Sequence, residues 1–142
     1  MNKEINILLV EDNEGDIVLT VEALNEAKIN NTVVVLRDGE EALKYLMKEE
    51  PYQNAETPNL IFLDINLPKI DGKEVLTKIK NHDLLKVIPV VILTTSDSEK
   101  DILDSYTNHA NCYITKPVDF KKFMEVIHRI KDFWISIVHL PN

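Results

Sequence analysis

Hydrophobic residues along this chain follow two alternating patterns. Short, nearly continuous apolar runs begin at Ile5, Thr32, Leu60, Pro89 and Cys112. Such runs are typical of strands covered on both faces. After each run, apolar residues recur every three or four positions, which is the spacing of an amphipathic helix. Five alternating strand–helix units predict an α/β fold, in which a five-stranded parallel sheet of order 2-1-3-4-5 carries helices on both faces.

The expected strands are residues 5–10, 32–36, 60–63, 89–93 and 112–114. Capping signals mark two helix starts: Ser98-Glu99-Lys100-Asp101 is a variant of the capping box that would open a fourth helix, and Asp119 would cap the last one. The residues expected on the inner helix faces are Ile17, Val18, Val21 and Leu24; Ala42, Leu43, Leu46 and Met47; Val75, Leu76 and Ile79; and Phe120, Phe123, Met124, Ile127 and Ile130.

The chain has 142 residues, of which 44% are apolar, as expected of one domain with one sizeable core. We predict a single domain over residues 1–142, with a core at about 4–131 and an apolar extension at 132–142. The extension is either a longer helix folded over its own sheet or an interface, and its β-branched residues favour an extended tail that pairs across a homodimer. Its candidate interface residues are Phe133, Trp134, Ile135, Ile137, Val138 and Leu140.

Charge and composition exclude several classes of protein. The formal net charge is −8, and the longest basic cluster is Lys121-Lys122, which argues against binding to nucleic acid. No apolar stretch reaches the roughly 20 residues of a membrane span, and no signal peptide is evident, so we expect a cytoplasmic protein without membrane contact. The single cysteine, Cys112, excludes an intrachain disulfide and a multi-cysteine metal site.

Polar residues follow four of the predicted strands. Glu11 and Asp12 come after the first strand, Asp64 and Asn66 after the third, Thr94 after the fourth, and Lys116 after the fifth. Ligands of open α/β sheets bind at the carboxyl ends of the strands, near the point where strand order reverses. These side chains should therefore converge at one edge of the sheet.

The residue types at this edge suit phosphoryl transfer. Three carboxylates brought together need a cation, and hard oxygen ligands without accompanying cysteine or histidine favour Mg²⁺. Lys116 can pair with Asp64 at rest and with a phosphoryl oxygen afterwards, while Thr94 offers a hydroxyl. An aspartate carboxylate can form an acyl phosphate, and Asp64 ends the central strand. We therefore predict that Asp64 is the nucleophile.

The set Glu11-Asp12, Asp64, Thr94 and Lys116-Pro117 resembles the receiver domains of two-component response regulators, over about residues 4–131. The resemblance implies a flavodoxin-like fold in which Asp64 is the phosphoacceptor. It implies further roles for the neighbouring residues: Glu11, Asp12, Asp64 and the backbone carbonyl of Asn66 as Mg²⁺ ligands, Thr94 as the switch hydroxyl, Lys116 as the phosphate-pairing lysine, a cis peptide between Lys116 and Pro117, and Tyr113 as the aromatic switch.

The segments 58–68, 93–96 and 111–113 and the ending 133–141 resemble, more narrowly, the single-domain regulators paired with phytochrome-type histidine kinases. The resemblance implies that a sensor histidine kinase donates the phosphoryl group. The output would be a change of protein partner without an effector domain, and the only enzymatic activity would be the domain's own phosphorylation and dephosphorylation.

Three alternatives stay open. A receiver fold could serve as a binding platform that is never phosphorylated. A phosphatase that passes through an aspartyl phosphate would want a second aspartate two residues after the nucleophile, where this chain has Asn66. A flavodoxin-like electron carrier would want a loop that cradles a flavin phosphate, and Glu11-Asp12 would repel one.

Overall fold

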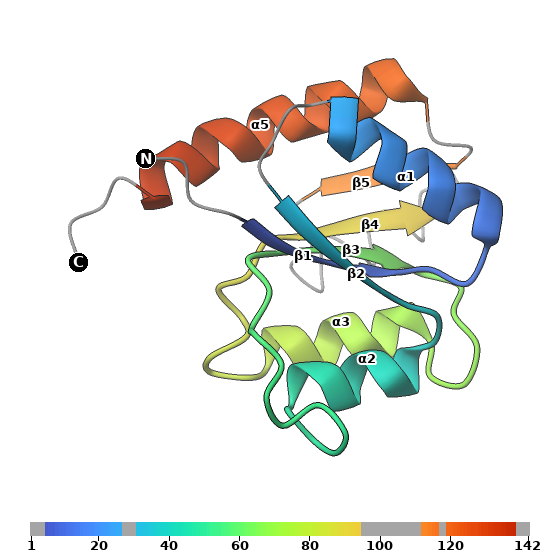
Figure 1. The fold of residues 1–142 in the computed structure, drawn as a ribbon, viewed down its shortest axis with the longest axis vertical. Helices are drawn as coiled ribbons and strands as arrows, with labels where there is room; N and C mark the ends of the chain where they lie inside the picture. Colours follow the sequence, from blue (N-terminus) through green and yellow to red (C-terminus); the bar gives the residue numbers. More distant parts are fainter. Residues whose placement is uncertain (1–4, 27–30, 95–111, 117–118, 139–142) are drawn as a thin grey trace.

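A computed structural model describes residues 5–26, 31–94, 112–116 and 119–138, with backbone alone at 31 and 130–138. Its five strands form one parallel sheet in the order β2-β1-β3-β4-β5, which confirms the predicted topology (Figure 1). The strands are β1 (Ile5–Val10), β2 (Asn31–Leu36), β3 (Leu60–Asp64), β4 (Val90–Thr94) and β5 (Cys112–Thr115). The helix predicted to open at Ser98 lies outside the described residues.

Helices cover both faces of the sheet. Those described are α1 (Glu14–Glu26), α2 (Gly39–Leu46), α3 (Gly72–Lys80) and α5 (Phe120–Val138). Figure 1 shows α1 and α5 on one face and α2 and α3 on the other. Each face has its own hydrophobic cluster, because every residue of β3 and β4 is buried and successive side chains point to opposite sides.

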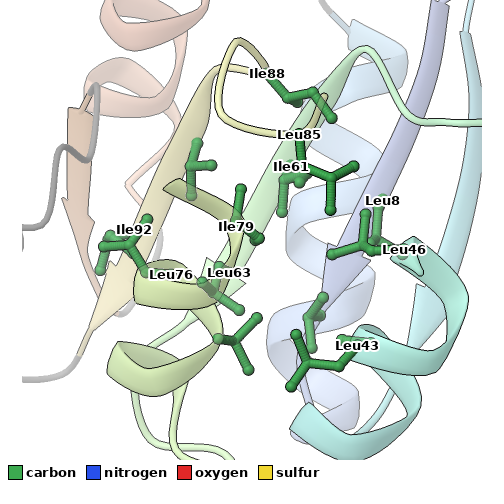
Figure 2. Packing of buried hydrophobic residues seen from close by; sticks show 14 of the residues in the cluster. Leu8, Leu43, Leu46, Ile61, Leu63, Leu76, Ile79, Leu85, Ile88 and Ile92 are labelled. Carbon is green, nitrogen blue, oxygen red and sulfur yellow. The ribbon is translucent and has the colours of Figure 1, made fainter. Parts of the chain in front are cut away.

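Leucine and isoleucine dominate the core under α2 and α3. Leu8, Ile61 and Ile92 from the sheet meet Leu46 and Ile79 from the helices (Figure 2). Under α1 and α5 the core centres on two aromatic rings. Phe62 of β3 stacks on Phe123 of α5 with 5.6 Å between ring centroids. Burying a side chain of this size stabilises the fold by about 1.5–3 kcal/mol, so the sheet is held firmly from both sides.

Two of the predicted core positions are wrong. Val18 and Phe120 are 46% and 52% exposed. On α1 the inner face is centred on Ile17, Thr20 and Leu24, where the Thr20 hydroxyl is satisfied by donating to the Asp16 carbonyl at 2.8 Å. Phe120 is the first residue of α5, and Phe123, one turn later, occupies the inner face instead.

The prediction of an extended C-terminal tail is also wrong as far as the structure describes it. Helix α5 continues through Val138, so residues 133–138 are helical; residues 139–142 lie outside the described part. Once a helix has formed, each added residue gains a backbone hydrogen bond, whereas an extended tail needs a partner strand for the same groups. Propagation of the helix therefore overrides the β preference of Ile135, Ile137 and Val138. None of the described helices is long and apolar enough to span a membrane.

Candidate functional site

The register of the sheet brings the predicted polar residues to one edge. Val10 pairs with Leu63, Asp64 with Leu93, and Thr94 with Thr115. The strands therefore end nearly level, and the residues that follow them meet. The amide of Lys116 donates to the carbonyl of Thr94 at 2.6 Å, which fixes the start of the loop after β5 against β4.

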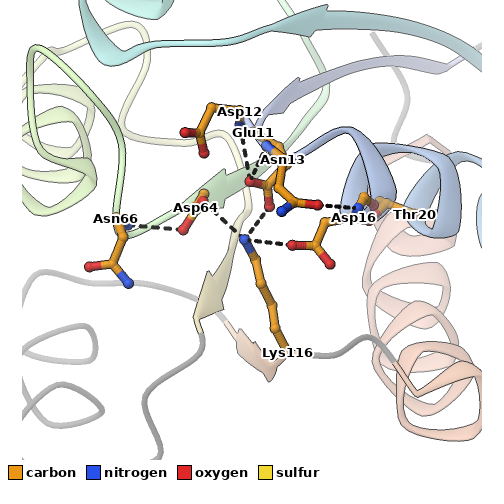
Figure 3. Close-up of polar contacts among 8 residues, drawn as sticks. All are labelled: Glu11, Asp12, Asn13, Asp16, Thr20, Asp64, Asn66 and Lys116. Carbon is orange, nitrogen blue, oxygen red and sulfur yellow. Dashed lines mark hydrogen bonds and ion pairs between the residues drawn. The ribbon is translucent and has the colours of Figure 1, made fainter.

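Lys116 is the centre of the site (Figure 3). Its ammonium donates to Asp64 Oδ2 at 3.0 Å, which confirms the predicted resting pair. It forms ion pairs with two further carboxylates, Glu11 Oε1 and, at 3.2 Å, Asp16 Oδ2. The lysine side chain is only 6% exposed, and charges held this far from water need close partners. Three carboxylates supply them.

The loop between β1 and α1 is folded around Glu11. This carboxylate is fully buried, and its Oε2 accepts hydrogen bonds from the amides of Asp12 at 3.0 Å and Asn13 at 3.1 Å. Asn13 caps α1, because its side chain accepts a bond from the amide of Asp16 at 3.0 Å. The capping role that an acidic or amide side chain could play here thus falls to Asn13, and the exposed Asp12 carboxylate stands beside the site.

Asp64 is held at both oxygens. Oδ1 accepts a hydrogen bond from the amide of Asn66 at 2.9 Å, while Oδ2 faces Lys116. Gly72, the first residue of α3, permits the loop after Asp64 to fold back closely. A methyl group on Gly72 would lie 2.2 Å from the Asp64 carbonyl oxygen, and the Gly72 amide donates to Ile65 at 3.1 Å. The backbone that carries Asp64 is therefore closely restrained.

Three carboxylates suit a divalent cation. Glu11, Asp12 and Asp64 each offer an oxygen, and these oxygens lie within 4.8 Å of one another. With Asp16 included, the site holds four carboxylates and one lysine, and a hard cation would neutralise part of this negative charge. The donor set is all oxygen and fits Mg²⁺.

The pKa values of the two buried groups respond to this crowding. Burial, followed by contact with Asp64, raises the pKa of Glu11 to about 7, although Lys116 and the Asn13 amide act in the opposite direction. Burial alone would lower the pKa of Lys116, but its contacts with Glu11 and Asp64 outweigh burial and hold this pKa above its ordinary value. The lysine therefore stays charged, whereas the charge of Glu11 changes near neutral pH.

Residues 7–128 match the family model described as the response regulator receiver domain. The chain belongs to this family. Receivers are the phosphoacceptor proteins of two-component signalling, and this chain has that role.

Individual relatives of this receiver are similar over nearly their full length. Response regulator Rcp1 of Synechocystis sp. is 47% identical over 135 residues, which are 95% of this chain and 92% of Rcp1. The phosphorylated cyanobacterial phytochrome response regulator RcpA superposes with a TM-score of 0.83 at 48% identity, covering 99% of this chain and 100% of RcpA. The Mn²⁺-bound form of Rcp1 gives a TM-score of 0.81 at 46% identity, covering 97% of this chain and 99% of the other.

The structure of this receiver brings together Glu11, Asp12, Asp64 and Lys116, with the Asn66 amide against Asp64. Thr94 is buried at the end of β4. Tyr113 on β5 is half-buried and packs against the core under α2 and α3. The roles predicted for these side chains stay predictions, as does the metal bond of the Asn66 carbonyl. Pro117 lies outside the described residues, and with it the predicted cis peptide.

Sequence reasoning missed Asp16. A signal was present, since Asn13 three residues earlier is a typical helix cap and places Asp16 in the first turn of a helix that starts beside Glu11. What the sequence did not contain was the direction in which the Asp16 side chain points.

Proposed function

We propose that Asp64 is the residue that accepts the phosphoryl group, with Mg²⁺ as the assisting cation. The position of its carboxylate is the main support for this proposal. It belongs to the three-carboxylate group of Glu11, Asp12 and Asp64 and also contacts the Lys116 ammonium. Glu11 shares both properties, but it is completely buried and its Oε2 is occupied by the amides of its own loop. Asp64 is buried as well, but the pKa of Glu11 is raised to about 7, so Glu11 is partly protonated near neutral pH and Asp64 is the better nucleophile.

In the proposed reaction an oxygen of Asp64 bonds to phosphorus as the bond between phosphorus and the donor's leaving group breaks. Glu11, Asp12 and Asp64, with the Asn66 carbonyl, would hold Mg²⁺, which supplies neutralisation of charge on the phosphoryl oxygens. Lys116 pairs with one of these oxygens and the Thr94 hydroxyl with another. The Asn66 amide keeps the Asp64 carboxylate oriented, so the site acts mainly by positioning.

The donor in this proposal is a sensor histidine kinase. Support comes from the family, and from the descriptions of Rcp1 and RcpA, which favour a kinase of the phytochrome type. Large apolar side chains are exposed on α1 and α5 (Val18, Leu19 and Phe120) and also in the loop after α3 (Leu84 and Val87), and each group offers apolar surface to a protein partner. In this proposal the phosphorylation takes place in the cytoplasm.

The remaining parts of the proposal concern assembly and output. Residues 133–138 continue α5 with a largely apolar sequence, which supports a homodimer built on this helix rather than on a paired extended tail. Phosphorylation then changes which protein the domain binds, with Thr94 and Tyr113 as the responding side chains, and the protein has no catalytic activity beyond its own phosphorylation and dephosphorylation.

Intact-mass measurement after incubation with Mg²⁺ and acetyl phosphate tests this function. We expect the mass gain of one phosphoryl group, lost on chelation of the metal and absent in Asp64→Asn. Asp83→Asn is the matched control, because Asp83 lies in the loop after α3 with its side chain almost fully exposed, and it should label like wild type. Undiminished labelling of Asp64→Asn would refute the assignment, and an unlabelled wild type would favour the binding platform.

A further inference from the structure

Lys116 has one partner outside the three-carboxylate group of Glu11, Asp12 and Asp64 that suits a cation. Of the three carboxylates around its ammonium, Glu11 and Asp64 belong to the group that suits a cation, whereas Asp16 does not. Asp16 comes from the first turn of α1, and its side chain is 19% exposed. It therefore approaches the lysine from a different element than the two other carboxylates.

A cation bound to the three-carboxylate group would change the surroundings of Lys116. Glu11 and Asp64 would share their negative charge with the cation, so their attraction for the ammonium would weaken, and the cation itself would repel the lysine. Asp16 keeps its full charge for Lys116. An ammonium has three hydrogens, so it can keep Asp16 as a partner and still donate to a phosphoryl oxygen.

We infer that Asp16 is a positioning residue, which holds the Lys116 ammonium at the site when the cation is bound so that it meets the incoming phosphoryl group. The inference rests on the proposed function. Asp16 is itself held in place: its amide donates to the Asn13 side chain at 3.0 Å, and its carbonyl accepts from the Thr20 hydroxyl at 2.8 Å. Both bonds fix the backbone from which the carboxylate reaches Lys116.

A purely structural role predicts something different. An acidic residue in the first turn of a helix interacts favourably with the helix dipole, and this alone would make Asp16 a contributor to stability. Glu14 stands in the same turn and also carries one negative charge, but it pairs with Arg37 at 2.7 Å on the surface. Glu14→Gln therefore removes an equal charge from the same helix end without touching the lysine.

The test measures the rate of phosphorylation by acetyl phosphate at saturating Mg²⁺, in variants shown to be folded by circular dichroism. We expect Asp16→Asn to slow phosphorylation about tenfold, the size of one charge-assisted contact, and Glu14→Gln to change it less than about twofold. In a Lys116→Met background, Asp16→Asn should bring no further loss, because its effect passes through the lysine.

Two results would overturn the inference: equal rates for Asp16→Asn and Glu14→Gln, or an equal slowing by Asp16→Asn with and without Lys116. If Lys116→Met does not fold, the comparison with Glu14→Gln decides alone. Failure of the proposed function has separate signatures, since either wild type would take up no label or Asp64→Asn would be labelled as strongly as wild type. Asp16→Glu, which keeps the charge, should recover part of the lost rate.

Discussion

Replacing Lys116 by methionine should destabilise the metal-free protein strongly. The substitution keeps an unbranched side chain of similar length but removes the cation that contacts Glu11, Asp16 and Asp64. Removing one partner from a buried ion pair costs about 3–5 kcal/mol, since it leaves uncompensated charge away from water. Against a total stability of about 5–15 kcal/mol, this is a large share.

The loss of stability in Lys116→Met should depend on pH and on bound metal. Without Lys116, the carboxylates can escape repulsion only by taking up a proton, and Glu11, whose pKa is already raised to about 7, is the group that will do so. The destabilisation should therefore shrink as the pH falls from 8 to about 5. Mg²⁺ should stabilise the variant more than it stabilises wild type, because it neutralises the same carboxylates without facing the lysine.

Urea unfolding followed by circular dichroism measures the effect. A loss of 3 kcal/mol corresponds to a drop of roughly 1–3 M in the urea midpoint for a domain of this size. Lys86→Met is the control, because Lys86 is 54% exposed and pairs with Asp83 at 3.7 Å, so its removal should cost less than about 1 kcal/mol. If Lys116→Met loses no more stability than Lys86→Met, the ion pairs of Lys116 with Glu11, Asp16 and Asp64 do not stabilise the fold as argued.

Three further predictions concern metal affinity, the loop after Asp64 and the C-terminal helix. The pKa of Glu11 is raised from 4.5 to about 7, so between these pH values the metal-free folded protein holds a proton on Glu11 that the unfolded chain has lost. Because Mg²⁺ must displace this proton, its affinity measured by calorimetry should fall as the pH drops below 7, by up to about tenfold per pH unit. An affinity that stays constant from pH 5 to 8 would contradict this. Gly72→Ala should lower the free energy of unfolding in urea by at least about 1–3 kcal/mol and slow phosphorylation, because the added methyl would lie 2.2 Å from the Asp64 carbonyl oxygen. Gly15→Ala is the control: its methyl would meet only a side-chain oxygen at 3.3 Å, so stability should change by less than about 1 kcal/mol. Light scattering should show a dimer that becomes a monomer when residues 133–142 are removed; a full-length monomer would rule out the dimer.

The sheet and the strand-end residues were predictable because their signals are local. Continuous apolar runs mark the strands, and the residue after each run lies at the carboxyl edge of the sheet, independently of how the helices are rotated or how long they are. The order of the runs therefore places Asp64 and Lys116 at the same edge with β4 between them, and the long lysine side chain reaches the carboxylate. Gly72 could not be assigned its role, because the close approach of α3 to the Asp64 carbonyl arises only once the loop is folded.

The errors arise where the outcome depends on the rotation or length of a helix. Val18 and Phe120 are apolar at positions near the edge of an inner face, and a small rotation decides whether such residues are buried. Asp16 points to Lys116 because Asn13 caps α1 at that residue and not one earlier. The end of α5 is helical because propagation from an existing helix outweighs the local propensity of β-branched residues.

The most direct test of the central claim is to locate the phosphoryl group. Borohydride reduces an acyl phosphate, so treatment of the Mg²⁺- and acetyl phosphate-incubated protein, followed by proteolysis and peptide mass spectrometry, marks the modified residue. We predict a single reduced residue at Asp64, dependent on Mg²⁺. Reduction at Glu11, Asp12 or Asp16 instead, or no reduced residue in the labelled protein, would contradict the account.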